Sequence, residues 1–563
     1  MMGRRSPQTG VFAADQMYLD YVGRETISGY LAQHRQHLFR DEDFAALYCP
    51  DNGRTSVPPS LAVTMLFLRA YDRVSFVEAV ERTKYDLRWK VALGLEMEAV
   101  PMQKSALQEF EAKLVLHKQG EALLKKSIQE ARRAGYLPQR KIRVALDTTP
   151  ILGKGAVKDT YNLLAEGIAK VGGCLAEAQG EEVKAWAQKQ ELSRYWGSRV
   201  KAEAAIDWDS KKQRQQLLTQ IVQDGRRVLS LAEKVKEEHP EQAEAIEVDA
   251  ALLRRLIAQD VEEKPDGPCQ IKQGTEKDRV VSVQDPEMRH GRKSASQRFD
   301  GHKAAVAVEI ESQLVSAVEV LPGNAGDQQK ALELVEPSER VMEAQGEETV
   351  GDCAYGGGPT RRAFAAVGRP LTAKVPASQN GDCFPKREFT IDLERMEARC
   401  PAGHTTNDYH SAGEGRGGHF TFAAADCQAC PLRSRCVRGQ GPRTLTVQAE
   451  ERLQQQARAH NQSEAGRKSL RERVVAEHRI ARLVGLGIRH SRYFGRQKTC
   501  LQVVMAAVVA NLTLVVGFCQ RRATEAAAGA EKASAELGNG LLVAFSSLWH
   551  RYFNWLALAW CNC

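Results

Sequence analysis

The amino-acid sequence predicts an α/β protein in which a mixed β-sheet is flanked by helices. Three observations lead to this prediction. Residues 15–140 show apolar residues at helical spacing, residues 155–265 read as amphipathic helices rich in Glu, Lys, Gln and Ala, and strands alternate with helices from 302 to 375. Mixed order of this kind is typical of a sheet with helices packed on its faces. At 563 residues the chain is also too long for one core.

Proline and glycine residues mark the boundaries of the predicted helices. Pro58-Pro59-Ser60 marks a helix start and Gly94 a break in the N-terminal region, and Pro240 marks the turn of a helical hairpin in the second region. The N-terminal bundle suits either binding to the ends of a DNA molecule or a structural cap or dimer surface.

The predicted sheet begins at Val144–Leu146, a short apolar run that ends at Asp147. After the long helical segment, a hairpin turns at Glu311-Ser-Gln313. The elements expected from there on are strands 302–310 and 314–320, helix 326–344, strand 348–352, helix 359–367 and strand 371–375.

Two acids end predicted strands. A single strand-end aspartate such as Asp147 usually opens a turn or caps a helix. Asp352, however, ends another strand of the same sheet and has glycines on both sides that let a bulky substrate come close. Two carboxylates at one sheet edge are suitable ligands for Mg²⁺, which prefers oxygen.

A third acid, Glu477, lies in a predicted helix over 467–485. Apolar residues surround it at helical spacing: Leu470, Val474, Ala481 and Val484. We therefore expect Glu477 to project from an apolar face, which is costly unless the carboxylate is paired or bound to a metal. A simple ion pair with Arg473, one turn earlier, is the alternative to a metal ligand.

The cysteines are mostly scattered, and their odd number, 13, indicates reduced thiols rather than a disulfide framework. One group is dense, and its members are Cys400, His404, Cys427, Cys430 and Cys436. Zinc takes four sulfur or nitrogen ligands, and the two-residue gap from Cys427 to Cys430 lets both thiolates face one ion. We expect a structural Zn²⁺ held by the four cysteines, with His404 able to replace one of them; a cluster of reduced thiols is the alternative.

Positive charge is concentrated in one block. Residues 466–498 hold ten Lys or Arg and two Glu, a surplus of eight that equals the net charge of the whole chain. Such a block indicates a polyanionic partner, although solvated basic helices are also common. The basic start lacks an apolar segment after it, and the apolar run 503–518 is short for a membrane span, so we expect a cytoplasmic protein with a buried helix there and no membrane partner.

Several motifs occur together in a fixed order. They are Asp147-Thr-Thr-Pro-Ile-Leu-Gly-Lys-Gly-Ala-Val-Lys-Asp-Thr-Tyr161, Asp285-Pro-Glu-Met-Arg289, Phe299-Asp-Gly-His-Lys303, Gly351-Asp-Cys-Ala-Tyr355, Glu477-His-Arg-Ile480 and Arg492-Tyr-Phe-Gly-Arg-Gln-Lys498. With these motifs the chain, from about residue 40 to 520, resembles bacterial insertion-sequence transposases. The resemblance is to the DDE group, which has an RNase H-like catalytic domain.

The resemblance implies that Asp147, Asp352 and Glu477 are the catalytic triad and hold two Mg²⁺ or Mn²⁺ ions. It implies a transposase that cleaves DNA and transfers strands at the terminal inverted repeats of its own insertion sequence. Its partners would be double-stranded DNA, as element ends and target, and a second copy of the chain in a paired-end dimer. Such a protein would be associated with the nucleoid when bound to DNA.

The chain departs from the family signature around the glutamate. Arg473 fits the Arg position of the Tyr, Arg, Glu, Lys pattern, but Leu470 stands at the Tyr position and Val484 at the Lys position. Other basic or aromatic residues are candidates for the missing DNA contacts: Arg489, Arg492, Tyr493, Arg496 and Lys498.

The expected domains follow from the motifs and composition. Residues 1–140 form the helical N-terminal domain, and the RNase H-like catalytic domain combines 141–160, 281–378 and 462–520. The remaining parts are a helical insertion at 161–280, a Cys-rich zinc-ribbon-like β insertion at 379–461 and a tail at 521–563, whose Ala- and Glu-rich part, 521–540, we expect to be flexible.

Two other functions are consistent with the same residues. One is a catalytically inactive or repurposed zinc-containing DNA-binding protein of the same fold, and the other is a metal-dependent nuclease that cuts without joining. Convergence of the three acids in space favours the transposase over the inactive protein, whereas a strand-transfer assay separates it from the nuclease.

Overall fold

The structure is a computed structural model that describes residues 1–563 except 7–8, 138–140, 198–199, 264–266, 295 and 561–563. Over 529–560 it describes the backbone alone. The chain forms two compact units: Met1–Lys113 with Lys126–Pro138 and Val508–Cys563, and Leu114–Lys125 with Gln139–Ala507.

The first unit is helical, as the sequence predicts. Its helices are α1 (Ala14–Met17), α2 (Leu19–Val22), α3 (Ile27–Leu38), α4 (Pro59–Asp72), α5 (Phe76–Tyr85), α6 (Leu87–Leu93), most of α7 (Lys104–Leu116) and the later part of α8 (Gly120–Arg133), with the 3₁₀ turn η1 (Asp41–Leu47). Helix α4 has Pro59 in its first turn, where a missing N–H costs nothing, and α6 ends at Gly94 with φ of +58°. Trp89 and Phe67 are fully buried between these helices.

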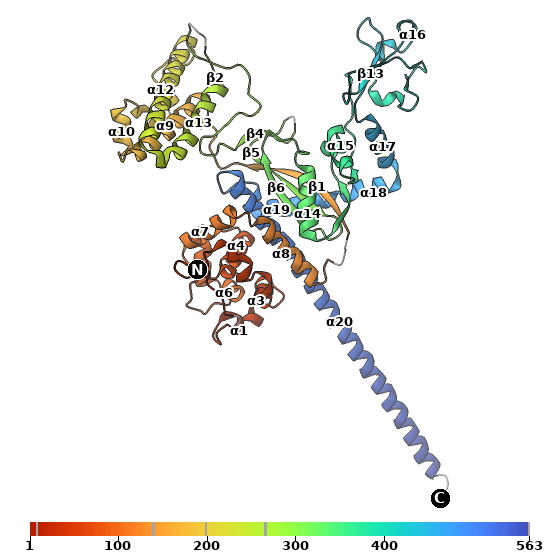
Figure 1. The fold of residues 1–563 in the computed structure, drawn as a ribbon. Coiled ribbons are helices and arrows are strands. Elements are labelled where there is room, and N and C mark those ends of the chain that lie inside the picture. The colour runs from red at the N-terminus through yellow and green to blue at the C-terminus, as the bar shows by residue number, and fades with distance from the viewer. Residues whose placement is uncertain (7–8, 138–140, 198–199, 264–266, 295, 561–563) are drawn as a thin grey trace. The chain divides into compact units, whose positions relative to one another are not determined.

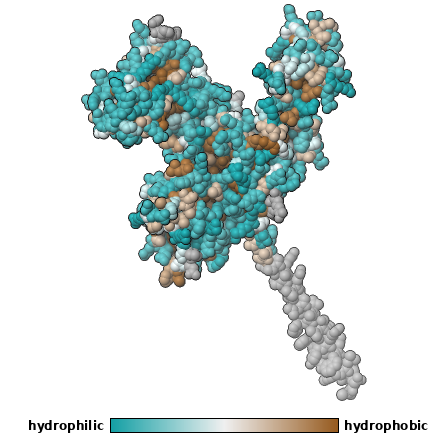
Figure 2. Space-filling model, in the orientation of Figure 1, coloured by the Kyte–Doolittle hydropathy of each residue, from teal (hydrophilic) through white to brown (hydrophobic). Residues whose placement is uncertain are grey.

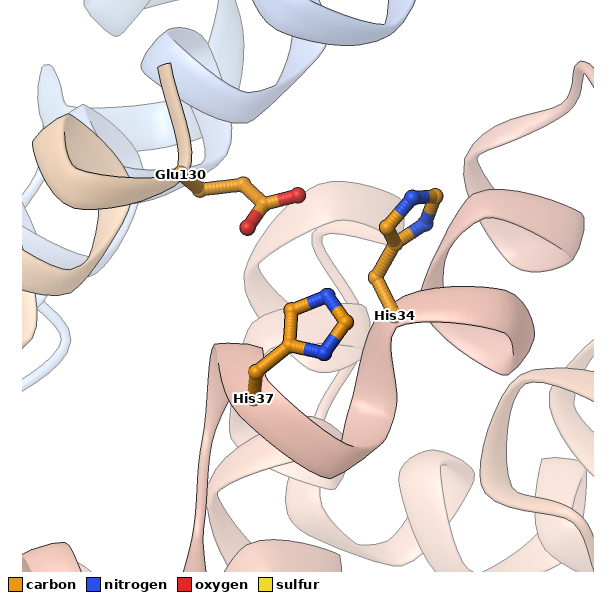
Figure 3. Close-up of side chains that lie close together, drawn as sticks. All are labelled: His34, His37 and Glu130. Carbon is orange, nitrogen blue, oxygen red and sulfur yellow. The ribbon is translucent and has the colours of Figure 1, made fainter. Parts of the chain in front are cut away.

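Helices α3 and α8 meet at a group of polar side chains within this unit. His34 and His37 on α3 and Glu130 on α8 point toward one another (Figure 3). Among the described residues, this is the one group of three His, Cys, Asp or Glu side chains whose ligand atoms all lie within 4.8 Å of one another.

The second unit is built on a curled mixed sheet, which confirms the α/β class (Figure 1). Its strands are β1 (Lys141–Leu152), β4 (Arg289–Arg292), β5 (Arg298–Glu309), β6 (Val315–Pro322), β7 (Gln345–Val350) and β8 (Leu371–Thr372). Antiparallel β5 and parallel β7 lie on the two sides of β1. Strand β8 extends the parallel half, and β4 and β6 pair with successive parts of β5.

The strand and helix order from 298 to 372 is the one that the sequence predicts. Helices α14 (Ala331–Met342) and α15 (Gly358–Ala366) separate β6, β7 and β8, and α14 packs on β5 and β6. The prediction was wrong about Asp147, however. Strand β1 continues past it to Leu152, and Asp147 lies opposite Val306 in the middle of the strand.

A helical region follows β1. It contains α9 (Thr160–Ala178), α10 (Val183–Lys189), α11 (Val200–Glu203), α12 (Lys211–Glu238) and α13 (Ala243–Asp260), the turns η2 (Ser193–Trp196) and η3 (Pro240–Gln242), and the short strands β2 (Val261–Glu262) and β3 (Gln270–Ile271). Helices α12 and α13 form the expected hairpin around Pro240, and both pack on α9. Their apolar faces form a core that includes Trp186, while hydrophilic residues cover most of the visible surface of this region (Figure 2).

Between β8 and the C-terminal helices, the cysteine-rich segment forms two small antiparallel sheets. Their strands are β9 (Thr390–Asp392), β10 (Glu397–Arg399) and β11 (Thr405–Thr406), and β12 (Tyr409–Ser411), β13 (Gly418–Thr421) and β14 (Thr444–Val447). The segment also contains α16 (Ala424–Ala429) and the 3₁₀ turns η5 (Lys386–Glu388) and η6 (Arg433–Arg435). A small core around Phe420 and Phe422 lies beside Cys400, Cys427 and Cys436.

The C-terminal helices are α17 (Glu451–Gln462), α18 (Glu464–Glu472), α19 (Val474–Leu483), the π-helical turn η7 (Val484–Ile488) and α20 (Arg496–Trp560). The single helix predicted over 467–485 is thus broken at Arg473, between α18 and α19. The flexible tail predicted from 521 is also wrong for the backbone, which stays helical to Trp560. Ala and Glu, which are abundant after 521, are strong helix formers.

Helix α20 holds the one described segment, Arg496–Ala528, that is long and apolar enough to cross a membrane. Of its most apolar 18-residue window, 72% is buried inside the protein. The burial agrees with the expected core helix, and Asn511 within it is hydrogen-bonded to Ser127 at 3.1 Å.

Candidate active site

The predicted acids approach one another beside β1. Asp147 comes from the strand itself, Asp352 from the residue that caps the 3₁₀ turn η4 (Cys353–Gly356) after β7, and Glu477 from the first turn of α19. Strand β7 stops opposite Ala145, so β1 extends beyond its neighbour and Asp147 lies next to the loop that carries Asp352.

Arg473 connects two of the acids. Its Nη1 lies 3.6 Å from Asp147 Oδ2, and its Nη2 forms an ion pair with Glu477. The Arg473–Glu477 ion pair that the sequence offers as an alternative is therefore present, but it lies beside Asp147 rather than apart from it.

The electrostatics also bring the three acids together. The pKa of Asp147 is raised to about 6. Burial is the largest cause, and the Asp352 and Glu477 carboxylates add to it, against the lowering effects of the Thr148 backbone N–H and Arg473. Only 19% of the Asp147 side chain is exposed. A site that disfavours the Asp147 charge in this way gains from a bound cation.

The surroundings of Glu477 differ from the prediction. Val474 and Ala481 are exposed, and Glu477 is half exposed with them, whereas Ala476, Ile480 and Leu483 form the buried face of α19. The expected apolar, core-facing position was wrong, because α19 packs through Ala476, Ile480 and Leu483 and leaves the face that carries Glu477 exposed.

A polar network fixes the C-terminal helices against the sheet. Arg143 on β1 donates to Glu348 on β7 at 2.9 Å and to Glu472 on α18 at 2.7 Å. Glu348 also accepts a bond from Ser469 at 2.9 Å. Because Glu472 precedes Arg473 directly, this network determines where Arg473 and Glu477 lie.

Sequence reasoning missed two other groups at the site. Tyr355 is fully buried, and its hydroxyl has no hydrogen-bond partner among the described residues. Burial raises the pKa of Tyr355 well above its usual range, and Asp147, Asp327 and Asp352 add to the shift. Asp327 itself accepts a bond of 2.8 Å from Lys303 of β5. Tyr355 and Lys303 are the last residues of the Gly351–Tyr355 and Phe299–Lys303 motifs. These motifs were the sequence signal that could have identified both residues as part of the site.

The predicted DNA-binding residues have different surroundings. Arg489 donates to the backbone of Pro150 at 2.9 Å and to Thr149, so it is fixed to β1. Arg492 and Tyr493 are partly buried, and Lys498 is exposed.

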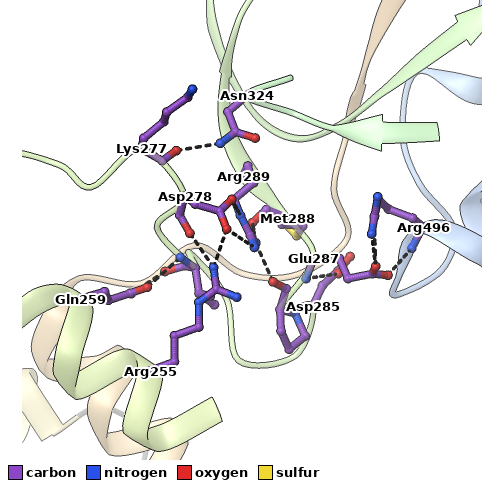
Figure 4. Close-up of polar contacts among 12 residues, drawn as sticks. Arg255, Gln259, Lys277, Asp278, Asp285, Glu287, Met288, Arg289, Asn324 and Arg496 are labelled. Atoms are coloured by element: carbon purple, nitrogen blue, oxygen red, sulfur yellow. Dashed lines mark hydrogen bonds and ion pairs between the residues drawn. The ribbon is translucent and has the colours of Figure 1, made fainter. Parts of the chain in front are cut away.

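Arg496 is engaged elsewhere, because it forms a two-point contact with Glu287 at 2.7 and 2.9 Å (Figure 4). In the same region Arg289 pairs with Asp278 at 2.6 Å, and Asp278 also accepts a bond from Arg255 of α13. These contacts fasten α13 and the start of α20 to the loop before β4.

The five predicted zinc ligands share one small cavity, which is lined by Cys400, His404, Cys427, Cys430 and Cys436. Burial raises the pKa of the Cys436 thiol, and Cys427, Cys400 and Cys430 add to the shift while Arg443 opposes it. Turns shape the cavity: Gly403, at φ +92°, donates to the Cys400 carbonyl at 2.9 Å. His404 contacts Asp426 at 3.7 Å.

Comparisons with known proteins find two matches to family models. Residues 399–516 match the model of the Transposase DDE domain, and residues 28–113 match the Transposase domain DUF772. No curated protein and no solved structure matches the chain. The two family matches support an insertion-sequence DDE transposase and indicate transposase function in general terms. Transposases of the DDE family generally bind DNA and use divalent metals.

Proposed function

We propose that the chain cleaves DNA and transfers strands at the terminal inverted repeats of its own insertion sequence, in a two-metal DDE reaction. The observation that carries the proposal is the approach of Asp147, Asp352 and Glu477, acids 205 and 125 residues apart, to one place beside β1. The sheet, with β6, β5 and β1 antiparallel and β7 and β8 parallel to β1, supports an RNase H-like catalytic domain.

The donor set fits hard cations, because all three side chains offer carboxylate oxygens. When bound, Mg²⁺ or Mn²⁺ would supply charge stabilisation to an in-line displacement at phosphorus. Asp147 and Asp352 would hold the ions from β1 and from the cap of η4. Glu477 would hold them from α19 once its ion pair with Arg473 is broken. Arg473 would then be available to a DNA phosphate.

The basic block fits a DNA partner. Arg489 is held against the end of β1, close in sequence to Arg492, Tyr493 and Lys498. We propose that these residues contact the phosphate backbone, and that Arg496 contributes mainly through its contact with Glu287. The chain would act on DNA in the cytoplasm as a homodimer at paired ends.

Structural zinc at the cysteine cavity is part of the proposal. Cys400, Cys427, Cys430 and Cys436 line one cavity and offer four sulfur donors, which is the number of ligands that structural zinc takes. His404 lines the same cavity and is the substitute for one of them. The ion would hold together small sheets whose own core is limited.

The decisive experiment is a Mg²⁺-dependent cleavage and strand-transfer assay on DNA with the element's ends. Asp352→Asn is the test variant: Asp352 caps η4 by accepting the Ala354 N–H at 2.9 Å, and Asn preserves such a cap. Asp159→Asn is the matched control, since Asp159 caps α9 in the same way. We expect Asp352→Asn to lose cleavage and the control to retain it.

Undiminished cleavage by Asp352→Asn would overturn the triad. Cleavage by the wild-type protein without joining would replace the transposase with a metal-dependent nuclease. DNA binding without any cleavage would favour the inactive DNA-binding protein.

A further inference from the structure

Within the described residues, the tightest group of potential metal ligands consists of side chains other than the three acids and the cysteines. His34 and His37 are one turn apart on α3, Glu130 lies on α8, and their ligand atoms are within 4.8 Å of one another (Figure 3). The residues at i and i+3 share one face of a helix, so both imidazoles reach the same point in space.

Hydrogen bonding prepares His34 to act as a ligand. Its Nδ1 lies 2.8 Å from the carbonyl oxygen of Tyr30, one turn earlier. Because a carbonyl can only accept, Nδ1 carries the proton and Nε2 keeps its lone pair. Imidazoles that bind metals are commonly oriented by this kind of second bond. The Tyr30 ring stacks on His34 at 3.9 Å and restricts the imidazole further.

Glu130 retains one acceptor position. Its side chain is only 3% exposed and accepts two bonds at Oε1, from Tyr30 and Arg133, and one at Oε2, from Arg133 at 2.9 Å. A carboxylate has about four lone-pair sites, so one remains at Oε2. The donors on Glu130 hold it in place, although the Arg133 charge limits the affinity for a cation.

His37 is the one exposed side chain of the three. Its ring lies edge-on to that of His34, with the ring centroids 5.6 Å apart, and one of its nitrogens belongs to the group of ligand atoms within 4.8 Å of one another. The exposure of His37 gives an ion a path from solvent and leaves room for a water ligand.

We propose that His34, His37 and Glu130 form a Zn²⁺ site that joins α3 to α8 within the helical unit, with water as the fourth ligand. Two imidazole nitrogens and one carboxylate oxygen suit zinc, whereas Mg²⁺ prefers oxygen donors alone. The site is separate from the proposed triad and from the cysteine cavity, and it does not depend on the proposed function.

The test measures zinc per chain in the full-length protein by mass spectrometry after purification with zinc and desalting. His37→Gln is the main variant, because His37 is exposed and its replacement leaves the core intact. His117→Gln, another exposed histidine that lies outside the group, is the control. We expect His37→Gln to hold one zinc fewer than the wild-type protein and than His117→Gln.

Tyr30→Phe tests the positioning of Glu130 without removing a ligand. Loss of the Tyr30 hydroxyl should weaken zinc binding by roughly 10–100-fold, as outer-shell changes do. Competition with a fluorescent zinc chelator gives this affinity, and circular dichroism checks that both variants are folded. Equal zinc content in the wild-type protein and His37→Gln would overturn the proposal.

Discussion

The acidic cluster at β1 and the cysteine cavity both gather potential metal ligands, but the chain builds them in different ways. The acids stand on a strand, a cap after a neighbouring strand and a helix, and Arg473 occupies the space between Asp147 and Glu477. The thiols come from a turn at Cys400, from α16 and its C-cap at Cys427 and Cys430, and from the end of η6 at Cys436, around one cavity of a small segment.

The two clusters differ in how much the surrounding fold depends on a bound ion. The acidic cluster rests on a large sheet with its own core, so we expect its fold not to depend on an ion. The cysteine segment has a core of only a few buried residues, among them Phe389, Phe420 and Phe422. An ion there would contribute to folding.

The largest effect is expected from Cys430→Ser. Structural zinc contributes about 10–16 kcal/mol of binding free energy in small zinc domains, so loss of one of four thiolates should release the ion and loosen the segment. Mass spectrometry should find one zinc fewer per chain, and limited proteolysis should cut faster within 379–461. Cys49→Ser, at an exposed cysteine, is the control. If the zinc content and the rate of proteolysis are unchanged, the fold of the cysteine segment does not depend on a bound ion.

A smaller effect on stability, in the opposite direction, is expected from Asp147→Asn. Cleavage should fall about 1000-fold, because the site loses several kcal/mol of charge stabilisation. In EDTA, however, the free energy of unfolding should rise by about 1–3 kcal/mol, since burial disfavours the Asp147 charge and each pKa unit is worth about 1.4 kcal/mol. Denaturant titration measures this change, with Asp382→Asn, at a fully exposed acid, as control. Destabilisation in EDTA would contradict the electrostatic account.

The sheet under the acidic cluster contains a fully buried pair, His302 with Asp285 at 3.2 Å. Burial raises the pKa of Asp285, but bonds from His302 and the Gly495 backbone outweigh it, and the pKa is lowered overall. A lowered folded-state pKa gives stability that is present above the unfolded value of about 3.9 and is lost as pH falls through the folded value.

We expect Asp285→Asn to cost about 3 kcal/mol at pH 7, because breaking a buried pair leaves a polar group uncompensated. The difference from the wild-type protein should shrink as the pH falls below about 4. Urea unfolding at a series of pH values measures it. A difference that is constant with pH would show that the Asp285 charge does not stabilise the sheet.

The smallest effect is expected from Arg473→Gln. Arg473 competes with a cation for Asp147 and Glu477, and its removal should strengthen Mg²⁺ binding by about 1 kcal/mol, or about fivefold. The Mg²⁺ dependence of the unfolding temperature reports this without any need for activity. Arg471→Gln, an exposed arginine on α18, is the control. Weaker Mg²⁺ binding in Arg473→Gln would show that Arg473 supports the cation instead.

Much of the fold follows from local patterns. The α/β class, the helical character of the N-terminal region predicted over 15–140, the hairpin of β5 and β6 and the order of elements to β8 agree with apolar periodicity and turn residues. The domain boundaries, the zinc ligands and the roles of the triad stay predictions. Local patterns could not place the break at Arg473 or the exposure of Glu477, because both depend on the Arg143 network that spans β1, β7 and α18.

The sequence by itself determined which acids to consider and that the cysteines form one group, since strand ends, motifs and short spacings are local properties of the chain. Three features came from the tertiary structure alone: Asp147 lies within a long strand, Arg473 reaches Asp147 as well as Glu477, and His34 and His37 face Glu130. Contacts between residues more than 90 positions apart depend on strand pairing and helix packing, which no single segment of the sequence encodes.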